Sequence, residues 1–419
     1  MSSNLKIALI GAGQRGMIYA GYAYEQPGIE IVAVVEPDEG RRLAAAKRLS
    51  LDSDQLFTDT ESFWKKGKLA DALIIASMDQ NHFEQTMSAL DLGYDILLEK
   101  PISPNPSECI KIERKAKETG CKVIVCHVLR YTNFFSTIKQ ILDNGELGRI
   151  ITIQHNENIG NFHMAHSFVR GNWRKSELTS PIIMQKSCHD MDILCWLTGK
   201  KAKRISSFGS LIHFKEANAP KGSTNRCTTC PVASKCQYNA VEAYLPICGC
   251  WPATVLTQDQ TEEGIMKALR EGPYGRCVYR CDNDVCDHQV TLIEFEDGIT
   301  ADFSLSGFTN KMYRSINIMC EYGEIRGNDD TNTIEVTHFV TNSVEKFDQR
   351  ILHPAIVDGA HGGGDIGLME DFIKLIQNPA CESKSAIEKS VESHIMAYAA
   401  EQARTSGTVV DVEALKSTL

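Results

Sequence analysis

Short apolar runs alternate with longer amphipathic stretches through the N-terminal third of the chain. Apolar runs of this length, bounded by turn residues, are typical of buried strands, and the stretches between them have the spacing of helices. Near-continuous apolar strands that alternate with helices indicate a parallel sheet covered on both faces. The predicted strands are residues 5–10, 31–35, 72–76, 94–98 and 122–126, and the predicted helices are 14–24, 38–49 and 81–92.

The pattern changes near residue 148, where strands begin in which apolar and polar residues alternate. This alternation is typical of an antiparallel or mixed sheet, so we expect a second α+β domain. We expect one domain over residues 1–128 and another over 129–419, with an insertion at about 220–286 and closing helices that return toward the first domain. The predicted strands are 150–156, 289–296, 299–306, 314–321 and 333–339, the turns Asp297-Gly298 and Gly323, and the helices 187–197, 366–377 and 386–405.

A glycine-rich turn follows the first predicted strand. Gly11, Gly13 and Gly16 form the pattern G-x-G-x-x-G, and Gln14 and Arg15 begin the helix behind it. In a dinucleotide-binding Rossmann domain the first glycine allows the tight turn, the second a close approach to pyrophosphate, and the third close helix–strand packing. The motif stands in the strand and helix context that it requires, so it predicts a dinucleotide cofactor held by these five residues.

The second predicted strand ends in an acidic residue, Glu36, twenty residues after Gly16. A carboxylate at this position binds the adenine-ribose hydroxyls and repels a 2′-phosphate, so we expect NAD rather than NADP. Arg41 and Arg42 lie close by in the sequence and keep NADP open as the alternative.

The charge balance limits the classes of partner. The 419 residues include 44 Lys and Arg against 54 Asp and Glu, which gives a net charge of −10. An acidic chain is a poor non-specific ligand for nucleic acid or anionic lipid. No apolar run reaches the roughly 18 residues that a spanning helix needs, and the N-terminus has no basic segment followed by an apolar one, as a secretion signal has. We therefore expect a cytoplasmic protein that binds neither nucleic acid nor membrane.

The tripeptide Glu99-Lys100-Pro101 directly follows the fourth predicted strand. Together with the glycine motif, it resembles the Gfo/Idh/MocA family of NAD(P)-dependent oxidoreductases. The segments 77–82, 127–131 and 189–192 are also similar to family motifs. The resemblance implies an α/β protein with an N-terminal Rossmann domain and a C-terminal α/β domain with a large open mixed or antiparallel sheet. That sheet often forms the oligomer interface in the family, so a homodimer or homotetramer is expected. The cofactor contacts implied beyond the glycine loop and Glu36 are Ser77, Asn81, His82, Glu99 and Lys100.

The resemblance also implies the chemistry, which is oxidation of a secondary hydroxyl of a sugar, glycoside or polyol by transfer of hydride to nicotinamide. Carried over residue by residue, Lys100 and His189 flank the reacting carbon. Their side chains suit this reaction, because it needs a base for the hydroxyl proton and a positive donor for the developing alkoxide. Histidine titrates near neutral pH and suits the base.

One position departs from the family pattern. Many members carry a carboxylate four residues before the catalytic histidine, and this chain has Gln185 there, followed by Lys186. The extra cation either replaces the carboxylate in binding substrate or favours an acidic or carbonyl substrate, and the identity of the base is open too.

Further candidates for substrate contacts lie near the same crevice. A tryptophan next to an arginine suits sugars, because indole packs on C–H faces and guanidinium bonds to hydroxyls or carboxylates. The loop 163–174 and the segment 361–365 before a helix are expected near the crevice. The proposed substrate-binding residues are Arg130, Tyr131, Trp173, Arg174, Lys186, Asp192 and His288.

Eight of the 15 cysteines lie within 227–286. Clustered cysteines in a cytoplasmic protein favour metal over disulfides. Cys227, Cys230 and Cys236 would supply three thiolates of a structural zinc site, and Cys277 is the preferred fourth. Cys281, and then Cys248 or Cys250, are the other candidates for the fourth ligand. An iron–sulfur cluster would use the same ligands, and a set of unliganded thiols is the plain alternative.

Two other functions compete with net oxidation. A tightly held NAD could oxidise a glycoside only transiently and permit elimination, which would make the protein a lyase- or glycosidase-like enzyme. A non-enzymatic regulator that senses the dinucleotide and uses the cysteine-rich window to bind a partner is the third hypothesis, and the presence of both Lys100 and His189 speaks against it.

Overall fold

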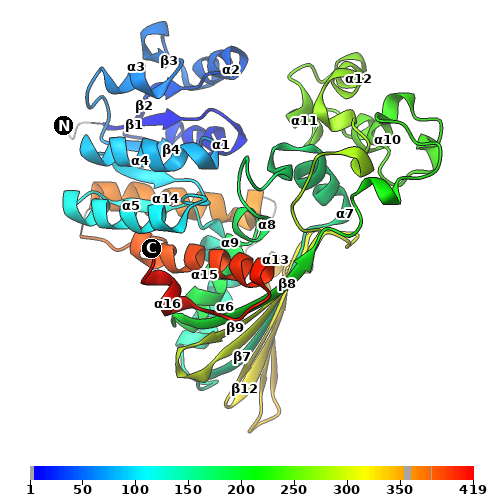
Figure 1. The fold of residues 1–419 in the computed structure, drawn as a ribbon. Coiled ribbons are helices and arrows are strands. Elements are labelled where there is room, and N and C mark those ends of the chain that lie inside the picture. Colours follow the sequence, from blue (N-terminus) through cyan, green and yellow to red (C-terminus); the bar gives the residue numbers. More distant parts are fainter. Residues whose placement is uncertain (1–3, 353–359, 379) are drawn as a thin grey trace.

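The computed structural model describes residues 4–352, 360–378 and 380–419. The chain forms two sheets that stand one above the other, with an additional module beside them (Figure 1). The strands of the N-terminal sheet are β1 (Leu5–Ile10), β2 (Ile29–Val35), β3 (Leu56–Phe57), β4 (Ala72–Ile75), β5 (Asp95–Leu98) and β6 (Val123–Val125).

The N-terminal sheet is parallel throughout, in the order β3-β2-β1-β4-β5-β6. This is the order of a doubly wound dinucleotide-binding fold, whose ligands bind at the carboxyl ends of the strands where the order reverses. The α/β class and the five long strands predicted from the apolar runs are confirmed, and only the two-residue β3 was not foreseen. Asp38 caps α2, since its Oδ1 accepts from the Arg41 N–H at 2.8 Å.

Helices cover both faces of this sheet. Two clusters of apolar side chains lie between the sheet and these helices. Each contains residues of β1, β4 and β5, and each packs against a different group of helices. The first group of helices is α1 (Gln14–Tyr24), α2 (Glu39–Leu49) and α14 (Gly364–Gln377), and the second is α3 (Thr60–Trp64), α4 (His82–Asp91) and α5 (Pro106–Thr119). Leu368, Met369 and Phe372 of α14 are buried against the same cluster as Ile7 and Leu9, so a helix from the end of the chain completes the N-terminal domain.

The second sheet has nine strands in the order β14-β13-β12-β11-β7-β10-β9-β8-β15. It is mixed, because β7 and β10 are parallel and the remaining pairs are antiparallel. The large open mixed sheet implied by the family resemblance is therefore confirmed. The strands are β7 (Ile150–Asn158), β8 (Ala202–Ser210), β9 (His288–Phe295), β10 (Thr300–Ser306), β11 (Tyr313–Cys320), β12 (Gly323–Asn328), β13 (Thr333–His338), β14 (Val344–Asp348) and β15 (Val410–Asp411).

Gly323 is a correction to the sequence prediction of a turn at this residue, because it begins β12 instead. A Cβ at this position would lie 2.4 Å from the Thr337 carbonyl oxygen of the neighbouring strand. Close packing inside the sheet therefore accounts for the glycine.

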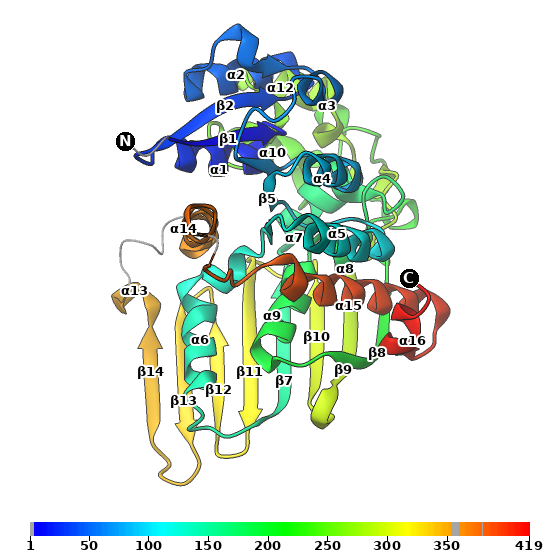
Figure 2. The same cartoon turned by 90° about the vertical axis from the view of Figure 1, so that its left-hand side faces the viewer.

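Helices cover only one face of the second sheet (Figure 2). They are α6 (Asn133–Asp143), α9 (Cys188–Thr198) and α15 (Ile387–Ser406), and α9 ends at Gly199 as predicted. α15 lies between the two sheets, and the segment before it pairs with β6 through the Val125 N–H and the Ser385 carbonyl at 2.9 Å. The shorter helices are α7 (Asn161–His163), α8 (Ile182–Gln185), α13 (Gln349–Leu352) and α16 (Val412–Lys416).

Residues 211–287 connect β8 to β9 and contain only helices and turns, all of them within the described part of the chain. The helices are α10 (Ala240–Tyr244), α11 (Ala253–Leu256) and α12 (Glu262–Glu271). This module stands beyond the end of β8 and β9 (Figure 1) and has a small apolar core of its own. Within the described residues, no helix is both long and apolar enough to cross a bilayer.

Candidate active site

The glycine loop between β1 and α1 leaves room for a pyrophosphate. Gly11 has a φ of 92°, and a Cβ there would lie 2.6 Å from the Ala76 carbonyl oxygen. A Cβ on Gly16 would lie 2.0 Å from the Gly11 carbonyl oxygen, whereas one on Gly13 would meet nothing within 4 Å. The open side therefore faces the start of α1, where none of the described side chains caps the helix. A helix N-terminus of this kind favours an anion, so the residues present fit a dinucleotide.

Glu36 lies at the carboxyl end of β2, beside this loop. Its Oε2 accepts from the Ala12 N–H at 2.9 Å and its Oε1 from the Asp38 N–H at 3.0 Å. Arg41 lies 3.2 Å from Oε1, and Arg42 donates to the Glu36 carbonyl oxygen at 2.7 Å. Both arginines are thus engaged around Glu36, in a region of the loop where an adenosine ribose binds in this fold.

The side chain of Arg15 bonds to acidic groups of other elements, and its expected role as a cofactor contact stays a prediction. Its Nε donates to Glu99 Oε1 at 2.9 Å, and its Nη1 donates to Asp365 Oδ2 of α14 at 3.1 Å. Tyr19 donates to the same Glu99 oxygen at 2.7 Å. Burial opposes ionisation of Glu99, but the Arg15 guanidinium outweighs it and lowers the pKa of the carboxyl. Glu99 therefore holds the loops of β1 and β5 together.

The loop after β4 carries the other expected cofactor contacts. Asn81 is exposed at the start of α4, and Ser77 Oγ donates to Gln85 Oε1 at 2.6 Å. His82 is buried, with Nδ1 2.8 Å from the Pro101 carbonyl oxygen and Nε2 3.2 Å from that of Ser77. A neutral ring has one N–H to donate, so His82 bonds to one of these two carbonyls and packs against the loop that follows Lys100.

Lys100 and His189 approach the same point from different domains. Lys100 follows β5, and its Nζ donates to the Gln185 carbonyl oxygen at 3.2 Å. Gln185 ends α8, and His189 lies one turn later, near the start of α9, where 7% of it is exposed. Burial raises the pKa of the Cys188 thiol to about 12, and the Lys100 charge opposes the rise. A lysine cation and an almost buried histidine therefore share one small region.

A buried ionic network lies behind this region. Lys186 Nζ is 3.3 Å from Glu157 Oε1, and Arg314 bonds to Glu157 and, at 2.8 Å from its Nε, to Asp190 Oδ1. His155 Nε2 lies 2.8 Å from the same Asp190 oxygen. Burial lowers the pKa of Lys186, and Glu157 opposes this effect. Sequence reasoning missed Glu157 and Arg314, although polar residues at the buried positions of alternating strands were a visible signal.

Three predicted substrate contacts serve the fold. Arg130 and Asp192 form a buried bidentate pair, with Nε–Oδ2 at 2.7 Å and Nη2–Oδ1 at 2.6 Å. Tyr131 donates its hydroxyl to Asp371 Oδ2 at 2.6 Å. Each of these polar groups has a partner within the protein. A buried charge needs one, because leaving it unpaired is very costly. They join the first domain to α9 and α14, and that they also bind substrate stays a prediction.

The other predicted substrate contacts also have partners within the protein. Arg174 is paired with Asp282 at 2.8 Å and so fastens the 211–287 module, and its expected role as a substrate contact stays a prediction. Trp173 is half-buried and packs against Phe168, with ring centroids 6.3 Å apart. His288 lies 2.9 Å from Asp287 Oδ1 at the start of β9. The expected loop 163–174 is a correction, because Met164–Arg170 and Asn172–Arg174 are helical. Burial lowers the pKa of His163, and Lys186 and Lys100 add to this, so His163 lies near both lysines. The side chain of His361, in the segment 361–365, is outside the described residues.

Sequence reasoning also missed His394 of α15, which contacts the loop that follows Lys100. Its Nε2 accepts from the Ile102 N–H, two residues after Lys100, at 2.9 Å. Its ring lies 5.6 Å from that of His127, which lies 6.0 Å from that of His189. A single histidine inside a long helix offers no signal in one sequence, because its partner is distant in the chain.

Acid should destabilise this fold through its buried histidines. Burial lowers the pKa of His394 to about 3 and that of His166 to about 4. The unfolded chain therefore takes up protons first, so the stability is complete above about pH 6.5 and is lost as pH falls toward 4. At pH 5 each such histidine costs about 2 kcal/mol. We expect thermal midpoints at pH 7 and pH 5 to differ less in His394→Gln than in the wild type. An equal difference in both proteins would contradict the assignment.

The four predicted zinc ligands lie together, around one cavity. Cys227, Cys230, Cys236 and Cys277 all line a space of about 20 Å³ in the 211–287 module. Across the described part of the chain, no three His, Cys, Asp or Glu side chains already stand as a metal-binding group. The positions of these cysteine side chains therefore do not by themselves show a zinc site.

Comparison with known proteins covers most of the chain. A family model described as the oxidoreductase family with an NAD-binding Rossmann fold matches residues 5–127. A second, described as the C-terminal α/β domain of the same oxidoreductase family, matches residues 139–412.

Curated relatives are distant in sequence. Putative oxidoreductase YteT of Bacillus subtilis is 25% identical over 313 residues, which is 72% of each chain. Inositol 2-dehydrogenase of Corynebacterium glutamicum is 26% identical over 49% of this chain and 57% of the relative. A 2,7-anhydro-N-acetylneuraminate hydratase of Mediterraneibacter gnavus is 25% identical over 50% of this chain and 54% of the relative. The chain thus spans little more than half the length of the last two.

Solved structures of similar fold cover nearly the whole chain. An oxidoreductase from Agrobacterium radiobacter, solved with NAD+, L-tartaric acid and magnesium, has a TM-score of 0.71 at 15% identity, over 98% of this chain and 99% of that one. The scyllo-inositol dehydrogenase of Lactobacillus casei, solved with NAD(H) and scyllo-inositol, has a TM-score of 0.66 at 18% identity and the same coverage. At these identities the likeness establishes the fold.

Proposed function

Because the chain belongs to the Gfo/Idh/MocA family of oxidoreductases, we propose that it is an NAD-dependent dehydrogenase that oxidises a secondary hydroxyl of a polyol, sugar or glycoside. The observation that carries this proposal is the hydrogen bond from Lys100, at the edge of a dinucleotide-binding sheet, to the Gln185 carbonyl, one helical turn before His189. The inositol dehydrogenases among the relatives support a polyhydroxylated substrate.

The two side chains divide the work on the substrate. His189 takes the hydroxyl proton, and the Lys100 ammonium donates a hydrogen bond to the oxygen as negative charge develops on it. When bound, NAD supplies the hydride acceptor. Gly11, Gly13 and Gly16 hold its pyrophosphate, and burial of His189 keeps bulk water from competing for the proton. Lys186 and His163, which lie next to this pair, contact the other substrate hydroxyls.

A screen for NADH formation tests the function. The purified protein is incubated with NAD and with inositols, aldoses, alditols and methyl glycosides, and absorbance in the NADH band is followed. We expect NADH to accumulate with at least one member of the panel, in proportion to the ketone formed. Binding of NAD without turnover of any member would overturn the proposal and favour the regulatory hypothesis.

The hydratase relative favours a second candidate, transient oxidation. In that reaction the ketone acidifies the adjacent C–H, a base removes the proton, and the neighbouring C–O bond breaks. The hydride then returns to the carbonyl carbon, so no reduced cofactor accumulates. The two candidates therefore differ in stoichiometry, because only net oxidation yields one NADH for each product molecule.

We expect Glu36 to set the preference for NAD. Glu36→Ala removes a charged hydrogen-bond acceptor from the ribose site, worth about 1.5–3 kcal/mol. The variant should lose roughly 10- to 100-fold in kcat/KM for NAD, and its ratio of NADP to NAD activity should rise. Glu39→Ala, on the exposed start of α2, is the matched control. An unchanged cofactor ratio in Glu36→Ala would contradict this role.

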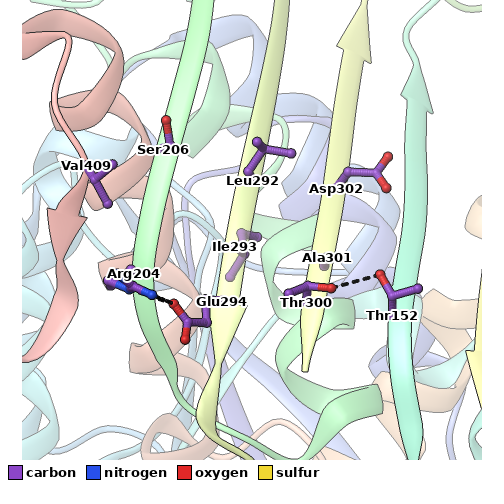
Figure 3. Close-up of a pocket in the computed structure, with 10 residues that line it drawn as sticks. All are labelled: Thr152, Arg204, Ser206, Leu292, Ile293, Glu294, Thr300, Ala301, Asp302 and Val409. Atoms are coloured by element: carbon purple, nitrogen blue, oxygen red, sulfur yellow. Dashed lines mark hydrogen bonds and ion pairs between the residues drawn. The ribbon is translucent and has the colours of Figure 1, made fainter. Parts of the chain in front are cut away.

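We also propose that the bare face of the second sheet joins copies of the chain into a homodimer or homotetramer. A shallow groove of about 380 Å³ crosses β8, β9 and β10 on this sheet (Figure 3). Around it Phe208 is 68% exposed, Leu292 52% and Val409 61%, an apolar patch that is unusual on a monomer. The many cysteines favour a reducing compartment, so a cytoplasmic location is part of the proposal.

A charge in this patch should dissociate the oligomer. Leu292→Arg places an unpaired cation in the interface, which is strongly unfavourable. We expect light scattering coupled to size exclusion to give the mass of an oligomer for the wild type and that of a monomer for Leu292→Arg. Val340→Arg, at an 87% exposed position after β13, should leave the mass unchanged. A monomeric wild type would contradict the proposed interface.

A further inference from the structure

Four cysteine side chains of the 211–287 module line one cavity of about 20 Å³, which is close to the space that a single water-sized sphere needs. They are Cys227, Cys230, Cys236 and Cys277. The other lining residues include neither histidine nor carboxylate. Among the lining residues, the thiols are therefore the side chains suited to bind a transition metal.

Main-chain hydrogen bonds bring the four cysteines together from two segments. The Cys230 N–H donates to the Cys227 carbonyl at 3.3 Å, and the Cys236 N–H donates to the Ala233 carbonyl at 2.9 Å, so two tight turns carry the first three thiols. The second segment is held against the first by a bridge between Arg226 and Arg276 and by the Cys277 N–H, which donates to the Asn225 carbonyl at 2.9 Å. Cys227 and Cys277 each follow a residue of this bridge, so the fold itself sets them side by side.

We propose that Cys227, Cys230, Cys236 and Cys277 bind one zinc ion as a structural tetrathiolate site. Sulfur ligands select zinc or iron over magnesium and calcium, and four protein ligands close a tetrahedron with no position left for substrate. The side chains of the described residues do not yet stand in a ligating group. Rotation of each cysteine about its single χ1 angle, between staggered positions, moves its sulfur toward or away from the centre of the cavity.

Positive charge next to the cavity suits such a site. A zinc ion with four thiolates carries two net negative charges, which neighbouring cations and N–H donors stabilise. Arg170 is buried, with its Nη2 3.6 Å from Cys227 Sγ and 2.7 Å from the Tyr238 carbonyl oxygen. Its Nε donates to the Arg276 carbonyl at 2.8 Å, so one guanidinium spans both cysteine-bearing segments.

The module has only a small apolar core that is separate from the rest of the protein. Its separate apolar core contains six buried residues, and its segments are short helices and turns without a strand among the described residues 211–287. Small units with so little core usually depend on a metal or on disulfides. A metal at this place would fix Arg170, which ends the helical segment Met164–Arg170 near His163. The zinc ion would thus help to hold the module against the helical segment Met164–Arg170.

Metal content tests the proposal directly. The protein is produced in zinc-supplemented medium, purified without chelators, and measured by inductively coupled plasma mass spectrometry. We expect one zinc per chain in the wild type, and a loss of most of it in Cys230→Ser and Cys277→Ser. Cys281→Ser and Cys250→Ser are the matched controls and should keep the metal, since neither residue lines the cavity. A wild type without zinc, or one that contains iron with visible absorption, would overturn the proposal.

Mass-spectrometric footprinting of the wild type covers the case in which the serine variants fail to fold. The native protein is treated with an alkylating reagent, with and without prior removal of metal by a chelator, and each cysteine is quantified. The four proposed ligands should react slowly before chelation and quickly after it, whereas the exposed Cys250 should react quickly in both samples. Reaction of the four at the same rate in both samples would overturn the proposal. NAD binding serves as the check that the N-terminal domain is intact.

Discussion

Lys100→Met is expected to lower kcat by about 10²- to 10³-fold, the usual cost of removing one donor to a developing oxyanion. The ammonium of Lys100 lies at the end of β5, held by the Gln185 carbonyl at 3.2 Å, and methionine keeps the length of the side chain without its charge. NAD affinity should stay close to that of the wild type, because Gly11, Gly13 and Glu36 are untouched. Single-turnover rates and a separate titration with NAD would measure the two quantities.

A matched substitution separates the role of this lysine from a general effect of charge. Lys117→Met changes an exposed lysine of α5 in the same domain and should leave both quantities unchanged. If Lys100→Met turned over the substrate at the wild-type rate, Lys100 would not be the group that stabilises the alkoxide. A loss of NAD binding instead of turnover would place it on the cofactor rather than on the substrate.

His189→Asn is expected to lower kcat by about 10²- to 10⁴-fold, the range typical of a lost general base. Asparagine keeps a polar side chain near the start of α9 but cannot take up a proton near neutral pH. The wild-type rate should rise with pH as the base loses its proton, and the rate of the variant should lose this dependence. Added imidazole should restore part of the activity, which a purely structural defect would not allow.

The control for His189→Asn is His338→Asn, a change in β13 of the second sheet that should leave the rate and its pH profile as in the wild type. If His189→Asn kept the wild-type pH profile, the proton would have to leave through another group, and His163 beside Lys186 would be the first to examine. If imidazole failed to restore activity and the melting temperature fell, the effect would be one of folding.

Most of the architecture was predictable, because both sheets are encoded in local patterns. The fully buried strands β1, β2, β4, β5 and β6 are continuous apolar runs, and the half-covered strands β7, β9, β10, β11 and β13 alternate. What escaped prediction was less periodic. α5 buries only Pro106, Cys109, Ile112 and Ala116 of its fourteen residues, and most of the other ten are polar. β12 begins at a glycine that looked like a turn.

The site was predictable where a motif stands in one continuous segment, as with the glycine loop and Lys100. It was not predictable where the partner of a side chain is distant in the sequence. Arg130 and Asp192 look like crevice residues in the sequence, and they meet as a buried pair only after α9 packs against the first domain. Glu157, Arg314 and His394 are invisible for the same reason, since each acquires its partner through the tertiary fold.

The position of α14 on the first sheet has a consequence for synthesis on the ribosome. β6 ends at Val125, whereas the helix that covers the same sheet begins at Gly364. At about 5–20 residues per second, the stretch between them takes roughly 10–50 s to translate. During that interval Ile7, Leu9 and their neighbours lack the cover that Leu368 and Phe372 later provide. The nascent N-terminal half is therefore expected to need a chaperone, and a chain released early should be degraded rather than persist as a separate NAD-binding fragment.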